Sequence, residues 1–318
     1  MGNTMIYNAD EFLWSEKYRP QKLNDCIIPE ETKTQLREFI EKKEIPNFLF
    51  SGGPGIGKTT VAKALAQELG ADVLFINASM ENGIDVLRTK IQGFASTVSF
   101  SGGPKIVILD EADYANPQSF QPALRGFIEE FSQNCRFILT CNYKNRIIPA
   151  IRDSRLTQIE FKIPAAQKPK IAAGMFKRVI DILKNENIKF DQKVVAKLVE
   201  RFFPDFRRTI NELQRYSVSG VIDEGILVNI ADINMGVLLK ALKEKDWKAM
   251  RQWVANNEDQ EAANLYKTIF DELVDKVNEA PQLILIIADY AYKSAFSVDQ
   301  QINLGACLTE IMASVSWK

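Results

Sequence analysis

The sequence contains no histidine in 318 residues, and this absence excludes several kinds of catalytic site. Without an imidazole there is no histidine general base, no serine–histidine nucleophile and no histidine ligand for zinc. The four cysteines, Cys26, Cys135, Cys141 and Cys307, show no C-x-x-C spacing, so we expect reduced, mostly buried thiols. Any chemistry must therefore use carboxylates, lysine, arginine and a metal ion.

Long apolar runs and a strong net charge are missing too. The longest apolar runs, such as Ile106 to Leu109, are far shorter than the roughly 20 residues of a membrane-spanning helix. The first residues lack the pattern of a secretory signal, so we expect a cytoplasmic protein, in the host cell if the source is viral. With 40 basic and 41 acidic residues, any DNA-binding face must be local or assembled from several subunits.

The first half of the chain alternates short apolar runs with helical stretches. Continuous apolar runs of this kind are typical of a parallel sheet that helices cover on both faces, which predicts an α/β P-loop domain. The expected strands are 48–50, 73–76, 106–109, 137–140 and 158–161.

Beyond Pro164 the strand pattern ends, and helical periodicity predicts a chain that is all-α from there on. A Gly/Asp-rich break at 219–225 separates a small helical lid from a last helical domain. Apolar spacing in that last domain, with most positions expected in its core, includes Leu238, Leu242, Trp247, Trp253, Leu265, Ile269, Leu273 and Val277. We therefore predict an α/β domain over 1–163, a lid over 164–230 and an oligomerisation domain over 231–318.

The segment Gly52 to Thr59 reads GGPGIGKT and fits the phosphate-binding pattern G-x-x-x-x-G-K-[ST] in full. Its glycines allow successive backbone amides to point into one cavity, and the following helix adds positive potential at its N-terminus. Lys58 is expected to reach the β- and γ-phosphates of ATP, and the Thr59 hydroxyl to bind Mg²⁺. An accidental lysine after a Gly-rich turn is the weaker interpretation, because a strand precedes and a helix follows.

A second motif lies about fifty residues further on, where four apolar strand residues end in acids. Asp110 is expected to bind Mg²⁺ directly or through water, and Glu111 to polarise the attacking water. Asn142 comes just after the run 137–141, where a strand beside the P-loop strand is expected to end. A short amide there can position that water or contact the γ-phosphate. Alone, two acids after a strand are usually a solvated strand end, and Cys141-Asn142-Tyr143 is an ordinary turn.

Five motifs occur in an order that resembles the sliding-clamp-loader ATPases of the AAA+ class. They are Trp14 to Pro20 (WSEKYRP), Asp110 to Asp113 (DEAD), Thr140 to Asn142 (TCN), Ser154-Arg155 and Asp205 to Arg208 (DFRR). The resemblance runs from about residue 14 to 227, and the segments 203–213 and 219–227 are similar to the large subunits of T-even bacteriophage clamp loaders. It implies an AAA+ P-loop domain with a helical lid and an all-α collar.

The resemblance also implies roles for single residues. Arg207 would contact the γ-phosphate of its own subunit's ATP, and Arg155 would reach into the site of a neighbouring subunit. Leu156 stands where the family usually has cysteine, with little consequence expected. The nucleotide-binding residues would be Ser15, Glu16, Lys17, Tyr18 and Ile27 on the adenine side, and Gly53, Pro54, Gly55, Ile56, Gly57, Lys58, Thr59 and Thr60 on the phosphate side.

Helix N-termini in this family face the backbone of primer–template DNA. Here the corresponding helices are expected to begin near residues 83–85 and 116–118. This gives Asn82, Gly83, Arg88 and Asn116 as candidate DNA contacts. The sequence Met80-Glu81-Asn82 lacks the basic residue that relatives often carry there.

The leading hypothesis is an ATPase subunit that acts with copies of itself and a dissimilar small subunit in a hetero-pentamer. ATP binding would open a sliding clamp and engage primer–template DNA, and hydrolysis would release both. One alternative is another AAA+ motor, such as an initiator or a branch-migration ATPase. A second is a non-catalytic module that holds ATP to stabilise an oligomer, although such relatives typically have a damaged P-loop or acid pair.

Overall fold

The computed structural model describes residues 12–81, 83–99, 102–226, 235–257 and 262–318. Asn82, one of the expected DNA contacts, lies outside these residues. The chain divides into two compact units, Met1–Glu224 and Gly225–Lys318. The finer division that the sequence predicts inside the first unit stays a prediction.

A five-stranded parallel sheet forms the centre of the first unit, with strand order β2-β3-β4-β1-β5. All five strands that the sequence predicts are confirmed. Their bounds are β1 Phe48–Gly52, β2 Asp72–Asn77, β3 Lys105–Asp110, β4 Cys135–Cys141 and β5 Thr157–Phe161. Because β4 lies between β3 and β1, the segments that follow these three strands meet at one edge of the sheet.

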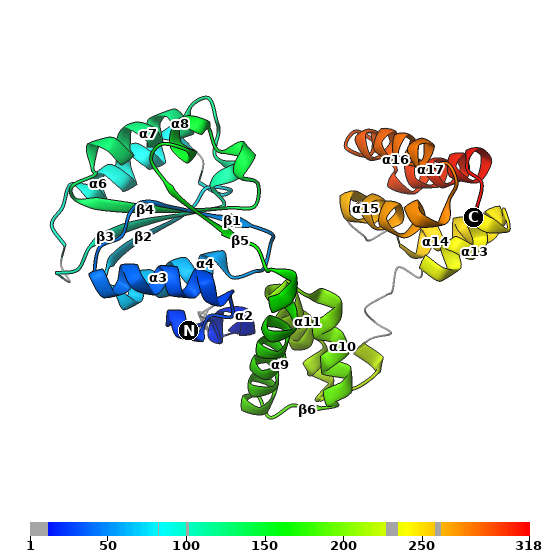
Figure 1. Ribbon diagram of the computed structural model, residues 1–318, viewed down its shortest axis with the longest axis horizontal. Coiled ribbons are helices and arrows are strands. Elements are labelled where there is room, and N and C mark those ends of the chain that lie inside the picture. Colours follow the sequence, from blue (N-terminus) through cyan, green and yellow to red (C-terminus); the bar gives the residue numbers. More distant parts are fainter. Residues whose placement is uncertain (1–11, 82, 100–101, 227–234, 258–261) are drawn as a thin grey trace, which may run out of the picture. The chain divides into compact units, whose positions relative to one another are not determined.

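Helices cover both faces of this sheet, α3 and α4 on one face and α6, α7 and α8 on the other (Figure 1). Successive side chains of a strand point to opposite faces, so Phe48 and Phe50 pack with Leu65 of α4, while Leu49 packs with Leu124 of α7. The helices and short helical turns around the sheet are α2 Trp14–Lys17, η1 Leu23–Asp25, α3 Glu30–Lys42, α4 Lys58–Glu68, α5 Ile84–Val86, η2 Leu87–Ile91, α6 Gln92–Ala95, η3 Ala112–Tyr114, α7 Phe120–Glu130, η4 Lys144–Arg146 and α8 Pro149–Arg152.

The remainder of the first unit is mainly helical. Its elements are η5 Ala165–Gln167, α9 Lys168–Asn185, β6 Lys189–Phe190, α10 Gln192–Phe202, α11 Phe206–Tyr216, η6 Ser217–Ser219 and β7 Val221–Ile222. The expectation of a purely helical chain after Pro164 was wrong in one respect, because β6 and β7 pair as a short parallel sheet. Two residues per strand are too few to leave a strand pattern in the sequence.

The described residues of the second unit, 225–226, 235–257 and 262–318, form five helices with their own core. They are α13 Met235–Lys243, α14 Trp247–Asn256, α15 Ala262–Leu273, α16 Ala280–Ser294 and α17 Gln300–Ser314, with the turn η7 Val274–Lys276. Leu242, Trp253, Ile269 and Leu308 are buried in one cluster. Trp247 is one exception to the predicted core, since 53% of it is exposed at the start of α14.

All four cysteines are free and buried, as expected. Burial raises the pKa of Cys135 to about 11 and that of Cys26, Cys141 and Cys307 to about 12. Among the described residues, no helix combines the length and hydropathy required to cross a bilayer.

Candidate nucleotide site

The P-loop connects β1 to α4 and takes backbone conformations that glycine permits. Gly55 and Gly57 have φ values of 68° and 95°, in the left-handed region that other residues rarely adopt. At Gly55 a Cβ atom would lie only 1.8 Å from Oδ1 of Asp205. Any side chain at Gly55 would therefore displace Asp205 from the P-loop.

The Lys58 ammonium lies between the P-loop and the end of β4. Its Nζ donates to the carbonyl oxygens of Gly52 at 2.9 Å and Gly53 at 2.7 Å, and to Asn142 Oδ1 at 2.9 Å. Burial lowers the pKa of Lys58 below its usual value, and the nearby Asp110 carboxylate opposes that shift. These contacts hold the positive charge at the P-loop, and the lysine of this motif binds the β- and γ-phosphates in P-loop ATPases.

Asp110 lies at the end of β3, and its carboxylate accepts hydrogen bonds from two hydroxyl groups. Its Oδ1 accepts from Thr59 Oγ1 at 2.6 Å and from Thr140 Oγ1 at 2.5 Å. A hydroxyl and a carboxylate are hard oxygen donors that suit Mg²⁺. In the described part of the chain, no group of three or more acidic, cysteine or histidine side chains is arranged so that it could hold a metal ion by itself. Thr59 and Asp110 therefore fit an ion that phosphate oxygens help to hold, rather than an all-protein metal cage.

Glu111 follows Asp110 and lies between β3 and η3. Its φ of 55° is left-handed, an unfavourable conformation for a residue with a side chain. Its amide donates to Thr140 Oγ1 at 3.2 Å, and the residue lines the pocket beside Lys58. A carboxylate in this position can act as the base that activates water.

Asn142 is the first residue after β4, next to the P-loop strand β1, in the place that the sequence predicts. Its side chain faces Lys58, as the hydrogen bond between them shows. The structure thus brings Lys58, Thr59, Asp110, Glu111 and Asn142 to a single pocket.

Only some of the residues predicted for the adenine side line this pocket. Ser15, Tyr18 and Ile27 do, but Glu16 and Lys17 do not. Glu16 instead pairs with Arg19, and Lys17 Nζ donates to Glu186 at 2.6 Å. On the phosphate side Pro54, Gly55, Gly57 and Thr60 line the pocket, whereas Gly53 and Ile56 do not.

Sequence reasoning missed several residues that line the pocket. They come from the segment after α2, from the end of β4 and from two helices beyond the sheet: Arg19, Cys26, Ile28, Thr140, Met175, Arg178, Phe206 and Ile210. The motif WSEKYRP contains Arg19, whose Nη1 donates to Thr60 Oγ1 at 3.1 Å, so its basic character was an available signal. Met175 and Arg178 are three residues apart on one face of α9, and their pattern is that of any amphipathic helix.

The start of α11 contacts the P-loop directly. Asp205 caps this helix by accepting from the Arg208 amide at 2.9 Å, and the Phe206 amide donates to the Gly55 carbonyl at 3.1 Å. Arg207, the next residue, is exposed and lines the pocket. The predicted contact of Arg207 with nucleotide is compatible with this position, since a helix N-terminus favours anions.

Arg155 lies outside this pocket, in the loop between α8 and β5. Its Nε donates to Glu129 at 2.8 Å, Nη2 pairs with the same carboxylate, and Nη1 contacts Ser154 Oγ at 2.6 Å. Arg155 therefore does not serve the pocket of its own chain in this conformation.

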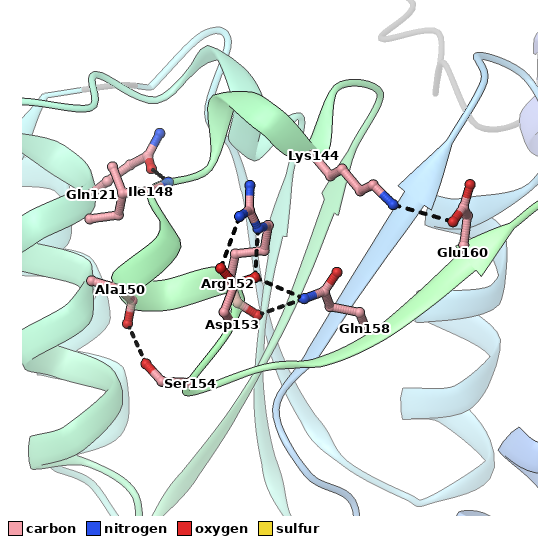
Figure 2. Close-up of polar contacts among 9 residues, drawn as sticks. All are labelled: Gln121, Lys144, Ile148, Ala150, Arg152, Asp153, Ser154, Gln158 and Glu160. Carbon is pink, nitrogen blue, oxygen red and sulfur yellow. Dashed lines mark hydrogen bonds and ion pairs between the residues drawn. The ribbon is translucent and has the colours of Figure 1, made fainter.

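Polar contacts hold the loop that carries Arg155. Figure 2 shows the Arg152 guanidinium on the Asp153 carboxylate, with bonds of 2.7 and 2.8 Å, and Gln158 of β5 bonded to both residues. Ser154 Oγ donates to the Ala150 carbonyl at 2.9 Å. Hydrogen bonds with α8 on one side and β5 on the other thus hold the loop that carries Arg155.

The segment before α8 is held as well. Figure 2 shows Gln121 Oε1 of α7 accepting from the Ile148 amide at 2.8 Å and Lys144 paired with Glu160 of β5.

The predicted DNA contacts lie at two exposed places. Gly83 is exposed immediately before α5, and Asn116 is exposed before α7. Arg88 lies in η2, which is a π-helical turn rather than a regular α-helix. The second helix begins at Phe120, later than predicted, because Asn116 Oδ1 accepts from the amides of Gln118 and Ser119 and holds a turn there.

Two family matches cover most of the first unit. Residues 48–165 match the ATPase family associated with various cellular activities (AAA). Residues 167–228 match the AAA+ ATPase lid domain of the sliding-clamp-loader large subunit.

Several curated proteins are similar over most of the chain. The sliding-clamp-loader large subunit of Enterobacteria phage T4 is 34% identical over 320 residues, covering 98% of this chain and 99% of that protein. That of Escherichia phage RB69 is 41% identical over 249 residues, covering 77% of each chain. The replication factor C small subunit of Sulfurisphaera tokodaii is 34% identical and covers 95% of each.

Among solved structures, the RuvB Holliday junction branch migration motor of Thermotoga maritima has a TM-score of 0.54 at 16% identity. The match covers 72% of this chain and 80% of that one. An identity this low supports a shared fold and nothing more.

Proposed function

Because the chain belongs to the sliding-clamp-loader ATPases of the AAA+ class, we propose that it binds and hydrolyses ATP as one subunit of an assembly that places a sliding clamp on primer–template DNA. The observation that carries the proposal is the convergence of Lys58, Asp110, Glu111 and Asn142 on one pocket. ATP binding opens the clamp and engages DNA, and hydrolysis releases the closed clamp.

The residues of this pocket divide the work of hydrolysis. Lys58 binds the β- and γ-phosphates, and Asn142, which already accepts a hydrogen bond from Lys58, orients the attacking water. Glu111 takes a proton from that water. Thr59 and Asp110 would hold Mg²⁺, which would supply charge neutralisation on the phosphate oxygens.

Arg155 completes the site of a neighbouring copy. It is absent from the lining of its own pocket, and its guanidinium lies in a loop that is anchored at both ends. An arginine that approaches the γ-phosphate from outside stabilises the charge that develops in the transition state. Hydrolysis by this mechanism requires at least two copies of the chain side by side, in a hetero-pentamer with one dissimilar small subunit.

The second unit supports an assembly role through its exposed apolar side chains. On α16 and just after it, Leu285, Tyr292 and Phe296 are exposed by 66%, 70% and 73%. Side chains of this size usually occupy interfaces when they gather on a surface. We assign α16 to contacts with other subunits of the loader.

The DNA contacts are proposed at the positions that the sequence predicts, and on the same basis. Gly83 and Asn116 offer backbone amides before helical segments, which bind phosphate without requiring basic side chains. Arg88 is retained as a candidate from its sequence position.

The test is ATP turnover by the assembled complex. The chain is co-expressed with its small subunit, and phosphate release is measured alone, with primer–template DNA, with clamp, and with both. The proposal requires a rise that needs both additions together. Turnover that responds to neither would indicate a different AAA+ motor, and a complex that binds ATP without turnover would indicate a structural module.

A further inference from the structure

Asp113 is a buried carboxylate that no step of the proposed hydrolysis uses. It lies in η3, three residues after Asp110, and only 5% of it is exposed. Removing a carboxylate from water is unfavourable unless hydrogen bonds compensate it. The partners of Asp113 therefore indicate why an acid occupies this position.

Both hydrogen bonds of Asp113 go to the backbone at the end of β4. Its Oδ2 accepts from the amide of Asn142 at 3.2 Å and from that of Tyr143 at 3.0 Å. The pairing of β4 with β3 ends at Leu139 and that with β1 at Cys141, so these two amides lie beyond the sheet. Asn142 is half-buried and Tyr143 is exposed, so Asp113 is the buried partner in both bonds. Its carboxylate is a stronger acceptor for the two amides than a neutral oxygen.

We propose that Asp113 is a positioning residue for Asn142, fixing the backbone from which the Asn142 amide group reaches the phosphate site. The contacts form a chain of three steps, from Asp113 to the Asn142 backbone, along the Asn142 side chain, and to Lys58 at 2.9 Å. The inference rests on the role proposed above for Asn142 in hydrolysis.

Glu111 connects β3 to the turn that carries Asp113. Its backbone is left-handed, and η3, which follows it, contacts β4. The same short segment thus carries the proposed base, Glu111, and the residue that holds Asn142. Asp113 Oδ1 has no hydrogen-bond partner among the described residues, so the two amides alone hold the carboxylate.

Loss of this carboxylate should affect turnover more than ATP binding. Lys58 and the P-loop amides bind the nucleotide, whereas Asn142 acts on the attacking water. A catalytic group misplaced by about 1 Å can slow a reaction by about 100-fold. We expect Asp113→Ala to lower kcat by about 10- to 100-fold and to change the KM for ATP by less than about threefold.

A double-mutant cycle tests whether Asp113 acts through Asn142. Turnover with DNA and clamp is measured in the assembled complex for Asp113→Ala, Asn142→Ala and the double variant. A positioning residue lowers kcat in the wild-type background and has no further effect in the Asn142→Ala background. Ile138→Val, in the middle of the same strand, is the matched core control and should leave kcat unchanged in both backgrounds.

Two further variants cover the case in which the alanine variant does not fold. Asp113→Asn keeps an oxygen that can accept both amides and should retain most of the wild-type kcat. Asp113→Glu keeps the charge but lengthens the side chain, which should displace Asn142 and lower kcat only where Asn142 is present.

Two results would overturn the inference. One is an equal loss of kcat from Asp113→Ala, or from Asp113→Glu, in both backgrounds, which would indicate a general structural role. The other is unchanged kcat for those variants when Asn142→Ala is slow. If Asn142→Ala itself is as active as wild type, the proposed role of Asn142 fails and the inference fails with it, while ATP hydrolysis by the chain still stands.

Discussion

Arg155→Ala should separate the affinity of the chain for ATP from the turnover of the assembly. Arg155 does not line the pocket of its own chain, and its guanidinium contacts Glu129 and Ser154 instead. Removing it takes no contact from a nucleotide bound to the same chain. We therefore expect an unchanged dissociation constant for ATP and a large loss of phosphate release in the complex.

The size of that loss follows from the charge that an arginine finger neutralises. Fingers supplied from another molecule contribute about 10³- to 10⁵-fold to turnover, which corresponds to about 4–7 kcal/mol of transition-state stabilisation. To act in a neighbour, Arg155 must leave Glu129, whose side chain is 53% exposed. Ion pairs at the surface are weak, so breaking this one reduces the gain by no more than about fivefold.

Glu129→Gln is the matched control for this argument. It removes the surface partner of Arg155 and keeps the arginine, so turnover should change by less than about fivefold in either direction. A loss as large as that of Arg155→Ala would show that the ion pair, rather than the arginine acting on a neighbour, supports turnover.

The assay combines two inactive variants. Arg155→Ala chains, with intact Lys58, are mixed with Lys58→Ala chains, whose Arg155 is intact, and phosphate release is compared with that of each variant alone. Mixed assemblies should regain part of the activity, because one chain supplies the nucleotide site and its neighbour the arginine. If both variants assemble and no mixture regains activity, the inter-subunit role of Arg155 is wrong.

The remaining predictions concern the pocket and the thiols. Lys58→Ala should lower ATP affinity or turnover by about 10²-fold or more, because a charge-assisted contact to the phosphates is lost. Its circular dichroism should stay near wild type. Undiminished phosphate release would contradict the P-loop assignment. Glu111→Gln should keep ATP and DNA binding and slow turnover by about 10²- to 10⁴-fold, since the amide cannot accept a proton from water. Unchanged turnover at saturating ATP would mean that another residue is the base. Burial raises the pKa of the four thiols, Cys26, Cys135, Cys141 and Cys307, to about 11 or 12, so they stay protonated at pH 8. Iodoacetamide should therefore label the native chain far more slowly than the urea-unfolded chain, as mass spectrometry can measure. Equal labelling rates would show that these thiols are accessible.

The sheet could be predicted because its strands carry a pattern that survives without tertiary information. Val107, Ile108 and Leu109 are all fully buried, and a continuous apolar run is what a strand covered on both faces requires. The phosphate side was predictable for a related reason. Its residues Lys58 and Thr59 lie within one contiguous motif, so the local sequence determines most of their geometry.

Residues that come from distant segments were not predictable in this way. Thr140 and Thr59 share the Asp110 carboxylate although 81 positions separate them in the chain, by their residue numbers. Asp205 contacts Gly55 only because the start of α11 lies against the P-loop. Neither contact leaves a periodic signal, since each depends on a single residue at the end of an element.

Asp113 shows most clearly where sequence reasoning stops. A run of acids after a strand is usually solvated, and the sequence alone gives no reason to treat the third acid differently from a surface residue. The difference appears only in the structure, where Glu111 is left-handed, η3 contacts β4, and Asp113 is buried with its carboxylate on two amides at the end of β4. Few residues with side chains adopt that conformation, and a structure retains such strain mainly where the surroundings require it. On our proposal, the left-handed backbone at Glu111 and the buried carboxylate at Asp113 act together, because both lie in the short segment that connects Asp110 to the backbone of Asn142.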